Sequence, residues 1–221
     1  MDDKDKTSGK ALSLMERAYK ELEEMIVTLQ LEPGAVLSEA GLAAQLGIGR
    51  TPIREAIHRL AREGLVVILP RRGILVSEFN IRSQLKLLEV RREIERLMAR
   101  SAAARATDEE RRVFRDIADG MTTAAERDDD VTFMRHDLRF NQLLAKACRN
   151  QYAASTMGLM AGLLRRFWFM HHKQVADMPL VAKCHADVAI AIARGDGEGA
   201  AAASDRLVDY AENFTRAALD N

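Results

Sequence analysis

SEAGLAAQLGIGRTPIREAIHRLAREG, residues 38–64, is the stretch of sequence from which the rest of the chain is best understood. It predicts two short helices joined by a tight turn. Ser38 can cap the first helix, because its hydroxyl can accept a hydrogen bond from a first-turn N–H. Gly47 and Gly49 permit the positive φ angles that a sharp turn between helices often needs. The stretch therefore indicates a helix-turn-helix unit.

The second helix of this unit is expected to begin near residue 51. Thr51 is predicted to cap it and Pro52 to occupy its first position, where no N–H partner is lost. Its apolar residues recur at i, i+3, i+4 and i+7, which predicts one buried stripe. The stripe consists of Ile53, Ala56, Ile57 and Leu60.

The polar residues of the same helix lie off the predicted stripe. Arg54 and His58 fall on the other side, and Arg50 and Thr51 stand at the N-terminal end. A helix that presents Arg and Thr in this way suits insertion into a DNA major groove. Arg can pair with guanine through two hydrogen bonds, while Thr and backbone N–H groups can hold phosphate. Helical spacing alone equally allows an ordinary pair of surface helices.

A β-hairpin is predicted directly after the two helices. Residues 65–69 and 74–76 are apolar runs rich in β-branched side chains, and residues 70–73 (PRRG) form a basic turn between them. This pattern is typical of the wing of a winged helix. Between Ser38 and Ser77 there are six Arg and three Glu, so positive charge is locally in excess although the whole chain has a formal net charge of zero. Such an excess is expected where DNA is bound.

The composition is that of a folded globular protein with room for two modest domains. The chain has 221 residues, of which 30% are charged and 48% hydrophobic. Its two cysteines, Cys148 and Cys184, form no CxxC motif, so a cytoplasmic location is expected. We also expect no membrane span and no enzymatic activity, since the sequence contains no Gly-rich phosphate loop, no GxSxG and no HExxH.

The order of elements predicts a mainly α protein with two domains. Residues 1–9 are expected to be disordered, and a first helix is expected from about Lys10. The predicted boundaries are a winged helix-turn-helix domain of three helices and a hairpin at 10–77, a linker at 78–83 and a helical domain at 84–221. No strand pattern occurs in the third segment, so it is expected to form an antiparallel bundle of about six helices with room for an internal pocket.

The first domain resembles the DNA-binding domain of the GntR family of bacterial transcription regulators. The resemblance rests on LEPG (31–34), on the stretch at 37–66 and on RRGILV (71–76), and it covers about residues 15–77. It departs at Ala40, where many relatives carry Arg, so a contact made there by relatives is not expected here. The resemblance, with the helix pattern above, gives the predicted DNA-binding residues: Ser38, Glu39, Arg50, Thr51, Pro52, Arg54, His58, Arg71, Arg72 and Gly73.

The second domain resembles the ligand-sensing FCD domain of the FadR-type branch of that family. The residues that carry this resemblance are EVRREIE (89–95), DLRFN (137–141) with Asn150, and residues 183–200, and it covers about residues 81–216. It implies that a small metabolite, expected to be a carboxylate, binds within the helices.

The resemblance also implies a metal site, which this chain carries only in part. Many FCD domains hold a divalent metal with one Asp and three His. Asp137 and His185 match two of these positions, but Asn141 and Leu207 replace the other two. A carboxylate, an amide and one imidazole are a poor set for a metal such as zinc. We therefore expect no certain cofactor and favour a metal-free pocket that reads its ligand by hydrogen bonds, with these candidate residues: Arg91, Asp137, Asn141, Arg165 and His185. Arg91 could instead only pair with Glu95, four residues on.

Together these observations predict a homodimeric regulator that binds a short palindromic DNA operator, acts as a repressor and responds to a small organic acid. The alternative is a protein–protein interaction module in which the winged helix docks a partner and the bundle dimerises. The effector, the direction of its effect on DNA binding and the regulated genes do not follow from the sequence.

Overall fold

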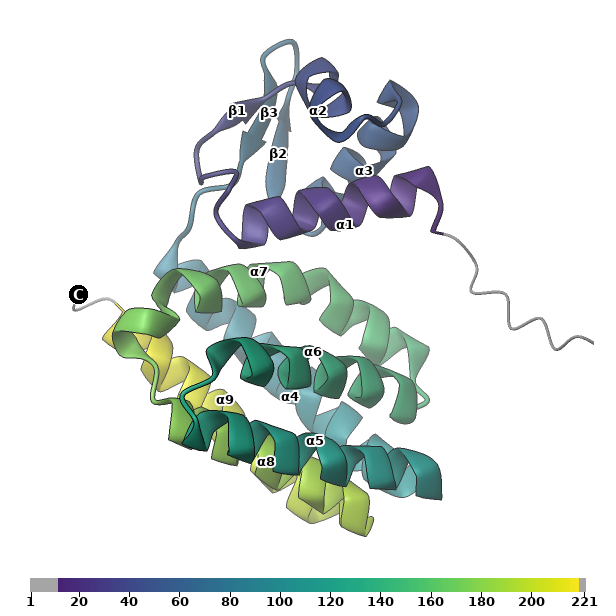
Figure 1. The fold of residues 1–221 in the computed structure, drawn as a ribbon, viewed down its shortest axis with the longest axis vertical. Coiled ribbons are helices and arrows are strands. Elements are labelled where there is room, and N and C mark those ends of the chain that lie inside the picture. The colour runs from purple at the N-terminus through teal and green to yellow at the C-terminus, as the bar shows by residue number, and fades with distance from the viewer. Residues whose placement is uncertain (1–11, 219–221) are drawn as a thin grey trace, which may run out of the picture. The chain divides into compact units, whose positions relative to one another are not determined.

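The computed structural model describes residues 12–218, and the chain divides into two compact units between Phe79 and Asn80 (Figure 1). The predicted disorder of residues 1–9 lies outside the described residues. The N-terminal unit contains α1 (Leu14–Val27), β1 (Val36–Leu37), α2 (Glu39–Leu46), α3 (Arg50–Arg62), β2 (Val66–Leu69) and β3 (Gly73–Val76). The helical unit contains α4 (Ile81–Arg105), α5 (Asp108–Glu126), α6 (Asp130–Ala147), α7 (Gln151–Val175), α8 (Met178–Arg194) and α9 (Gly197–Ala217).

In the N-terminal unit, α1 packs against α3 and fixes its buried side. The predicted stripe is confirmed, because all four of its residues are at most 2% exposed: Ile53, Ala56, Ile57 and Leu60. α1 begins at Leu14, four residues later than expected, because Ser13 and Glu16 form a capping box that satisfies first-turn N–H groups.

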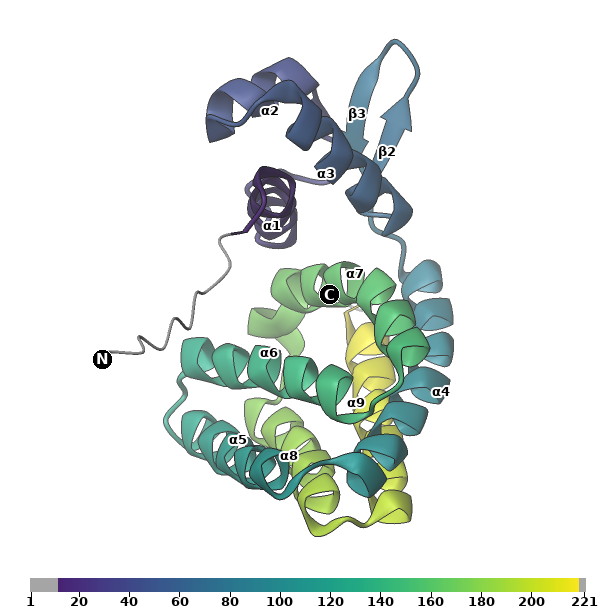
Figure 2. The same ribbon diagram turned by 90° about the vertical axis from the view of Figure 1, so that its right-hand side faces the viewer.

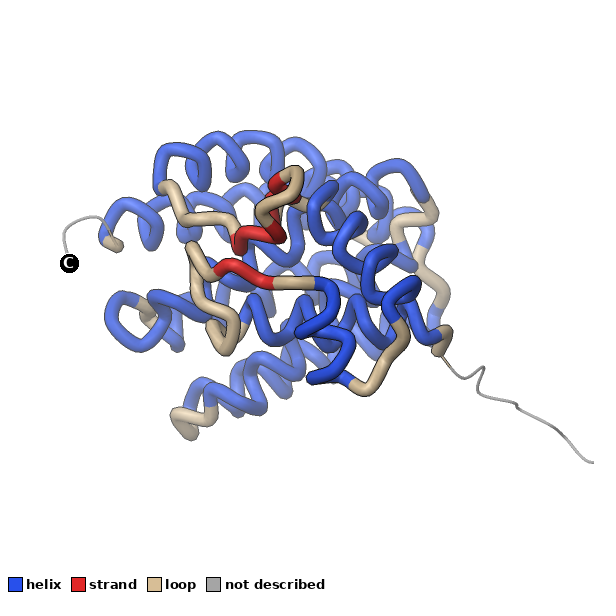
Figure 3. The backbone as a smooth tube through the Cα atoms, turned by 90° about the horizontal axis from the view of Figure 1, so that it is seen from above, coloured by secondary structure: helices blue, strands red, loops and turns tan. Residues whose placement is uncertain are grey.

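The predicted hairpin is confirmed and carries a third strand that the sequence pattern did not indicate. The order in the sheet is β1-β3-β2, and both pairings are antiparallel (Figure 3). β1 has only two residues, too few for an alternation to be recognised. Gly73 has φ +106°, and a Cβ there would lie 2.8 Å from the carbonyl oxygen of Leu37. Only glycine fits where β1 approaches β3 so closely.

The helical unit is the predicted all-helical bundle, with six helices among the described residues. α4 packs on α9, and α5 on α8, around a core that includes Phe114, Ile117 and Phe140 (Figures 1 and 2). The capping box of Thr107 and Glu110 begins α5. The expected linker at 78–83 is wrong in its second half, because Asn80 caps α4 and residues 81–83 are already helical.

Candidate nucleic-acid interface and candidate effector site

The turn between α2 and α3 is built by one cap and one glycine. Ser38 caps α2, and its Oγ accepts a hydrogen bond from the Gly41 N–H at 3.0 Å. Gly47 ends α2 in the left-handed region at φ +63°, as the sequence predicted. The prediction for Gly49 was wrong, because its φ is −59°.

The predicted start of α3 was also wrong, by two residues. Gly49 is the N-cap and α3 begins at Arg50, so Thr51 lies inside the first turn and does not cap. Pro52 is half-buried in that same turn, where an N–H would have no partner within the helix. Arg50 and Thr51, which precede Pro52, therefore carry their backbone N–H groups at the N-terminal end of α3, the end that the sequence analysis assigned to phosphate contact.

One face of α3 is exposed and cationic. We call it the recognition face, and it consists of Arg50, Thr51, Arg54 and His58. All four are exposed, whereas the residues of the opposite stripe are buried. A cationic helix face with guanidinium groups in water can meet phosphates and the edges of bases in a major groove.

Glu39 joins the recognition face from the first turn of α2 (Figure 2 shows the two helices). Arg54 donates from Nε to both carboxylate oxygens at 2.9 and 3.1 Å, and from Nη2 to Oε2 at 2.8 Å. The hydrogen bond from Arg54 and the charges of Arg54, His58 and Arg50 hold the pKa of Glu39 below its ordinary value. This pair was not predicted from the sequence, because the contact crosses the turn between two helices.

The hairpin tip presents the second group of cations. Arg71 and Arg72 are exposed in the turn between β2 and β3. The Arg72 N–H donates to the Leu69 carbonyl at 3.0 Å, with Pro70 and Arg71 between them. Arg71 has φ +61°, a conformation that costs a residue with a Cβ about 1–2 kcal/mol. The turn therefore holds a strained arginine at its tip.

Behind the recognition face, a polar cluster fastens α3 to α1. The Tyr19 hydroxyl donates to Glu63 at 2.9 Å, and Arg59 donates to the same carboxylate at 3.0 Å. The Arg59 guanidinium also lies 3.6 Å from the centre of the Tyr19 ring. Burial, with the charge of Glu23 and the contact with Glu63, raises the pKa of Tyr19 far above its ordinary value. The cluster joins α3 to α1 by polar contacts, and sequence analysis missed it.

In the helical unit, the structure brings three of the predicted effector residues together. His185 Nε2 lies 3.0 Å from Asp137 Oδ1, and the side chain of Asn141 donates to the same oxygen at 3.1 Å. His185 Nδ1 lies 2.9 Å from the carbonyl oxygen of Val181. Both nitrogens of His185 thus face acceptors, and the ring can donate to both only as an imidazolium.

The charges of this cluster shift both pKa values towards an ion pair. Burial is the largest influence on His185 and would lower its pKa, but the hydrogen bond and charge of Asp137 outweigh it and raise the pKa. Burial would likewise raise the pKa of Asp137, yet the hydrogen bond and charge of His185 and the charge of Arg91 hold it below its ordinary value. We call Asp137 and His185 the buried pair.

The cluster does not fit a metal ion. A metal ligand must offer a lone pair towards the ion, whereas both nitrogens of His185 face acceptors within the protein, Asp137 and the carbonyl of Val181. Arg91 adds a positive charge that acts on both members of the buried pair, and Leu207, 2% exposed, offers no donor atom. Among residues 12–218, no group of three His, Cys, Asp or Glu side chains is arranged to hold a metal.

The two arginines predicted for the effector site behave differently. Arg91 donates from Nε to Glu95 at 2.7 Å, the i,i+4 pairing that the sequence allowed as the alternative to ligand contact. Its charge nonetheless acts on Asp137, so it belongs to the cluster. Arg165 lies half-buried on α7 and is not among the groups that most affect the pKa values of the buried pair.

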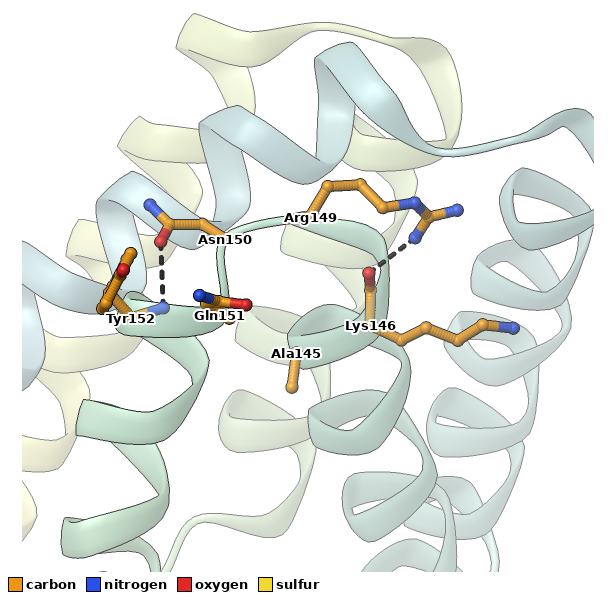
Figure 4. Close-up of a pocket in the computed structure, with 6 residues that line it drawn as sticks. All are labelled: Ala145, Lys146, Arg149, Asn150, Gln151 and Tyr152. Carbon is orange, nitrogen blue, oxygen red and sulfur yellow. Dashed lines mark hydrogen bonds between the residues drawn. The ribbon is translucent and has the colours of Figure 1, made fainter.

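A surface hollow of about 530 Å³ lies elsewhere on the helical unit, at the turn from α6 to α7 (Figure 4). It is lined by Ala145, Lys146, Arg149, Asn150, Gln151 and Tyr152. None of the predicted effector residues lines it. Arg149 and Lys146 are committed to the nearly buried carboxylate of Glu110, which ties this turn to the start of α5.

Within the part of the chain that the structure describes, no helix is both long and apolar enough to span a bilayer. Two family models match the sequence. "Bacterial regulatory proteins, gntR family" matches residues 14–76, and "FCD domain" matches residues 86–210, more than half of the chain.

Curated relatives match along most of their length. The "HTH-type transcriptional repressor RspR" of Escherichia coli is 27% identical over 93% of this chain and 91% of its own. An "Uncharacterized HTH-type transcriptional regulator in unstable DNA locus" of Streptomyces ambofaciens is 31% identical over 80% of this chain and 75% of its own.

Among solved structures, E. coli McbR/YncC has a TM-score of 0.78 and 18% identity, with 94% of this chain and 99% of that chain covered. A "putative transcriptional regulator GntR" from Rhodococcus sp. RHA1 has a TM-score of 0.69 and 21% identity, with the same coverage. These two show the shared fold. With the family models and the relatives, they make this chain a transcription regulator rather than an enzyme: it belongs to the FadR-type branch of the GntR family, with an FCD domain as its helical unit.

Proposed function

We propose that this regulator binds a short palindromic operator as a homodimer and represses transcription in the cytoplasm, where its operator lies. The recognition face of α3 would enter the major groove, and Arg71, Arg72 and Gly73 at the hairpin tip would lie in the adjacent minor groove. The observation that carries the proposal is the exposure of Arg50, Thr51, Arg54 and His58 on one side of a helix whose other side is buried. Ser38 and Pro52 support the helix ends that approach the phosphates.

The homodimer follows from the expected symmetry of operator and protein. Two copies related by a two-fold axis would place two α3 helices in successive major grooves, so the operator would be palindromic. The helical unit offers apolar residues for such contact. Val90 and Leu97 on α4 are 49% and 41% exposed and stand one heptad apart, and Tyr152 and Leu159 on α7 are 78% and 50% exposed with the same spacing. α4 and α7 pack on one another.

The proposed effector is a small carboxylate that binds at Arg91, Asp137, Asn141, Arg165 and His185. His185 as an imidazolium and Arg91 as a guanidinium are both held by carboxylates of the protein, Asp137 and Glu95. A ligand carboxylate has the same chemistry and can compete for either cation.

The effector would act through α4, which carries Arg91 and begins two residues after the boundary between the units. A ligand that binds better to one placement of Arg91 would favour one of two arrangements of the DNA-binding units. The size of the shift is set by the difference between the ligand's affinities for the two arrangements. No covalent step is required.

The DNA-binding proposal is tested by selecting duplexes from a random-sequence pool with the full-length protein. We expect enrichment of a palindrome, bound at least about a thousandfold more tightly than unrelated duplex at the same salt concentration. Recovery of no preferred sequence would contradict it, and capture of a protein partner through the recognition face would favour the interaction-module alternative.

The effector proposal is tested separately, by the shift in melting temperature that a panel of small carboxylates produces in the wild type and in Asn141→Ala. Asn141 is chosen because its loss leaves the buried pair in place. We expect at least one acid to stabilise the wild type and to stabilise the variant less. Equal shifts in melting temperature for both proteins would show that the cluster is not part of the effector site.

A further inference from the structure

Within residues 12–218, a salt bridge between Glu39 and Arg54 joins α2 to α3 on the exposed side of the helix-turn-helix, at the recognition face. The pair is not shielded from water: the side chains of Arg54 and Glu39 are 59% and 33% exposed. An exposed pair of this kind contributes little to stability. Its effect on where the guanidinium points is therefore the more informative property.

The pair uses one edge of the guanidinium and leaves the other edge available. Arg54 commits its Nε–H and one Nη2–H to the carboxylate, two of its five N–H groups. The uncommitted groups are on Nη1 and on the far side of Nη2. They form the end-on fork, whose two parallel N–H groups match O6 and N7 of a guanine. Glu39 can thus hold the side of Arg54 while its end meets a base.

The carboxylate also changes how the recognition face meets phosphate. Arg50, Arg54 and His58 all act on the charge of Glu39. A negative group beside Arg50 and Arg54 lowers the net attraction of the recognition face for the backbone of any duplex, and non-specific binding is governed by that attraction. A flexible, unpaired arginine would instead adapt to whichever phosphate lay near.

We propose that Glu39 is a positioning residue for specificity: it holds the guanidinium of Arg54 by its side, so that the end-on fork faces one base, and it reduces binding to non-operator DNA. This rests on the proposed operator binding. Glu39 then has no base contact of its own. Glu39 would raise the ratio of operator affinity to non-specific affinity, and it would act only through Arg54.

The experiment compares four full-length proteins, namely wild type, Glu39→Gln, Arg54→Ala and the double variant, on operator and on unrelated duplex over a range of salt concentrations. For Glu39→Gln we expect the specificity ratio to fall about fivefold to tenfold, the loss of one oriented charge-assisted hydrogen-bonded contact. Non-specific affinity should rise, and its dependence on salt should steepen by about one released ion. In the double variant, Glu39→Gln should change the operator affinity by less than twofold relative to Arg54→Ala alone.

Glu55→Gln is the matched control. Glu55 is an exposed carboxylate on α3, next to Arg54 in the sequence. The substitution removes one negative charge, as Glu39→Gln does, but leaves the Glu39–Arg54 pair intact. It should leave the specificity ratio within about twofold of the wild type. Melting temperatures of all variants check that the fold is retained.

The outcomes separate this inference from the proposed function. If Glu39→Gln leaves the ratio unchanged while Arg54→Ala lowers it, operator binding stands and the positioning role is wrong. If Glu39→Gln changes base preference even without Arg54, Glu39 reads a base directly and the inference is overturned. If the wild type prefers no duplex at all, the proposed function itself fails.

Discussion

The two units each hold a carboxylate against a cation, and the two pairs differ in what surrounds them. Glu39 and Arg54 meet in water on the recognition face, whereas His185 is almost buried and its partner Asp137 is 30% exposed. An exposed pair can exchange partners at little cost, but a buried pair leaves an uncompensated charge when one member is removed. The comparison indicates that the exposed pair can be altered without altering the fold, whereas the buried pair also stabilises the helical unit.

The largest expected effect is on the stability of the helical unit. His185→Ala should lower the free energy of unfolding by about 3 kcal/mol, the low end for a broken buried pair because Asp137 is partly exposed. Denaturant titration measures it. Lys183→Ala is the matched control, since it breaks an exposed pair with Asp187 on the same helix and should cost less than about 1 kcal/mol. Equal losses in both variants would mean that the buried pair is no more important than a surface contact.

The second effect is on operator affinity alone. Arg54→Ala should weaken operator binding by about 1–3 kcal/mol per half-site, the value of one arginine–guanine contact, with a melting temperature within a degree or two of the wild type. A gel-shift titration at fixed salt measures the affinity. Arg62→Ala, also an exposed arginine on α3 but at its C-terminal end, should bind nearly as the wild type does. Similar losses for both would show that only total charge matters.

The third effect concerns Arg71, where one substitution should raise the stability of the N-terminal unit and weaken DNA binding. Arg71→Gly should stabilise the N-terminal unit by up to about 1 kcal/mol, because glycine tolerates φ +61°, yet it should weaken DNA binding and lower the salt dependence by about one ion. Arg72→Gly removes the same charge without relieving the backbone. It should therefore weaken binding without the gain in stability, and a gain in Arg72→Gly as well would disprove the strain.

The smallest effect is a gradual dependence on pH. The raised pKa of His185 gives stability that is present below its ordinary value of 6.5 and is lost as the pH rises through the raised value. The lowered pKa of Asp137 gives stability that is present above its ordinary value of 3.8 and is lost as the pH falls through the lowered value. The stability difference between wild type and Asp137→Asn should thus be greatest between pH 4 and 6.5 and shrink on both sides. A constant difference from pH 4 to 9 would argue against the ion pair.

Much of the fold could be predicted because it depends on local patterns. The stripe from Ile53 to Leu60 follows the helical period, and Ser38 and Thr107 cap the helices that the sequence assigned to them. Thr51 failed as a cap because Gly49 can begin the helix two residues earlier through its backbone alone. β1 was missed because it is specified by the pairing of Val36 and Leu37 with β3, a contact distant in sequence.

In the candidate sites, too, features that depend on local patterns could be predicted and features that depend on packing could not. Exposure of Arg50 and Arg54 follows from their place opposite a periodic stripe, so sequence alone could give it. The pairs Glu39–Arg54 and Asp137–His185 join residues 15 and 48 positions apart, and only the packing of the helices brings them together. The family resemblance placed Asp137 and His185 in one site but could not indicate that the two side chains would lie within hydrogen-bond distance of each other.

Base-analogue substitution in the operator is the sharpest test of the proposal that Arg54 reads a guanine from the major groove. In the selected operator, each guanine is replaced in turn by 7-deazaguanine, which removes the N7 acceptor and keeps the base pair. We expect one guanine in each half-site whose replacement weakens binding by the wild type about fivefold, the loss of one charge-assisted hydrogen bond, and leaves binding by Arg54→Ala unchanged. If every replacement affected both proteins equally, the proposed contact between Arg54 and a guanine would be contradicted.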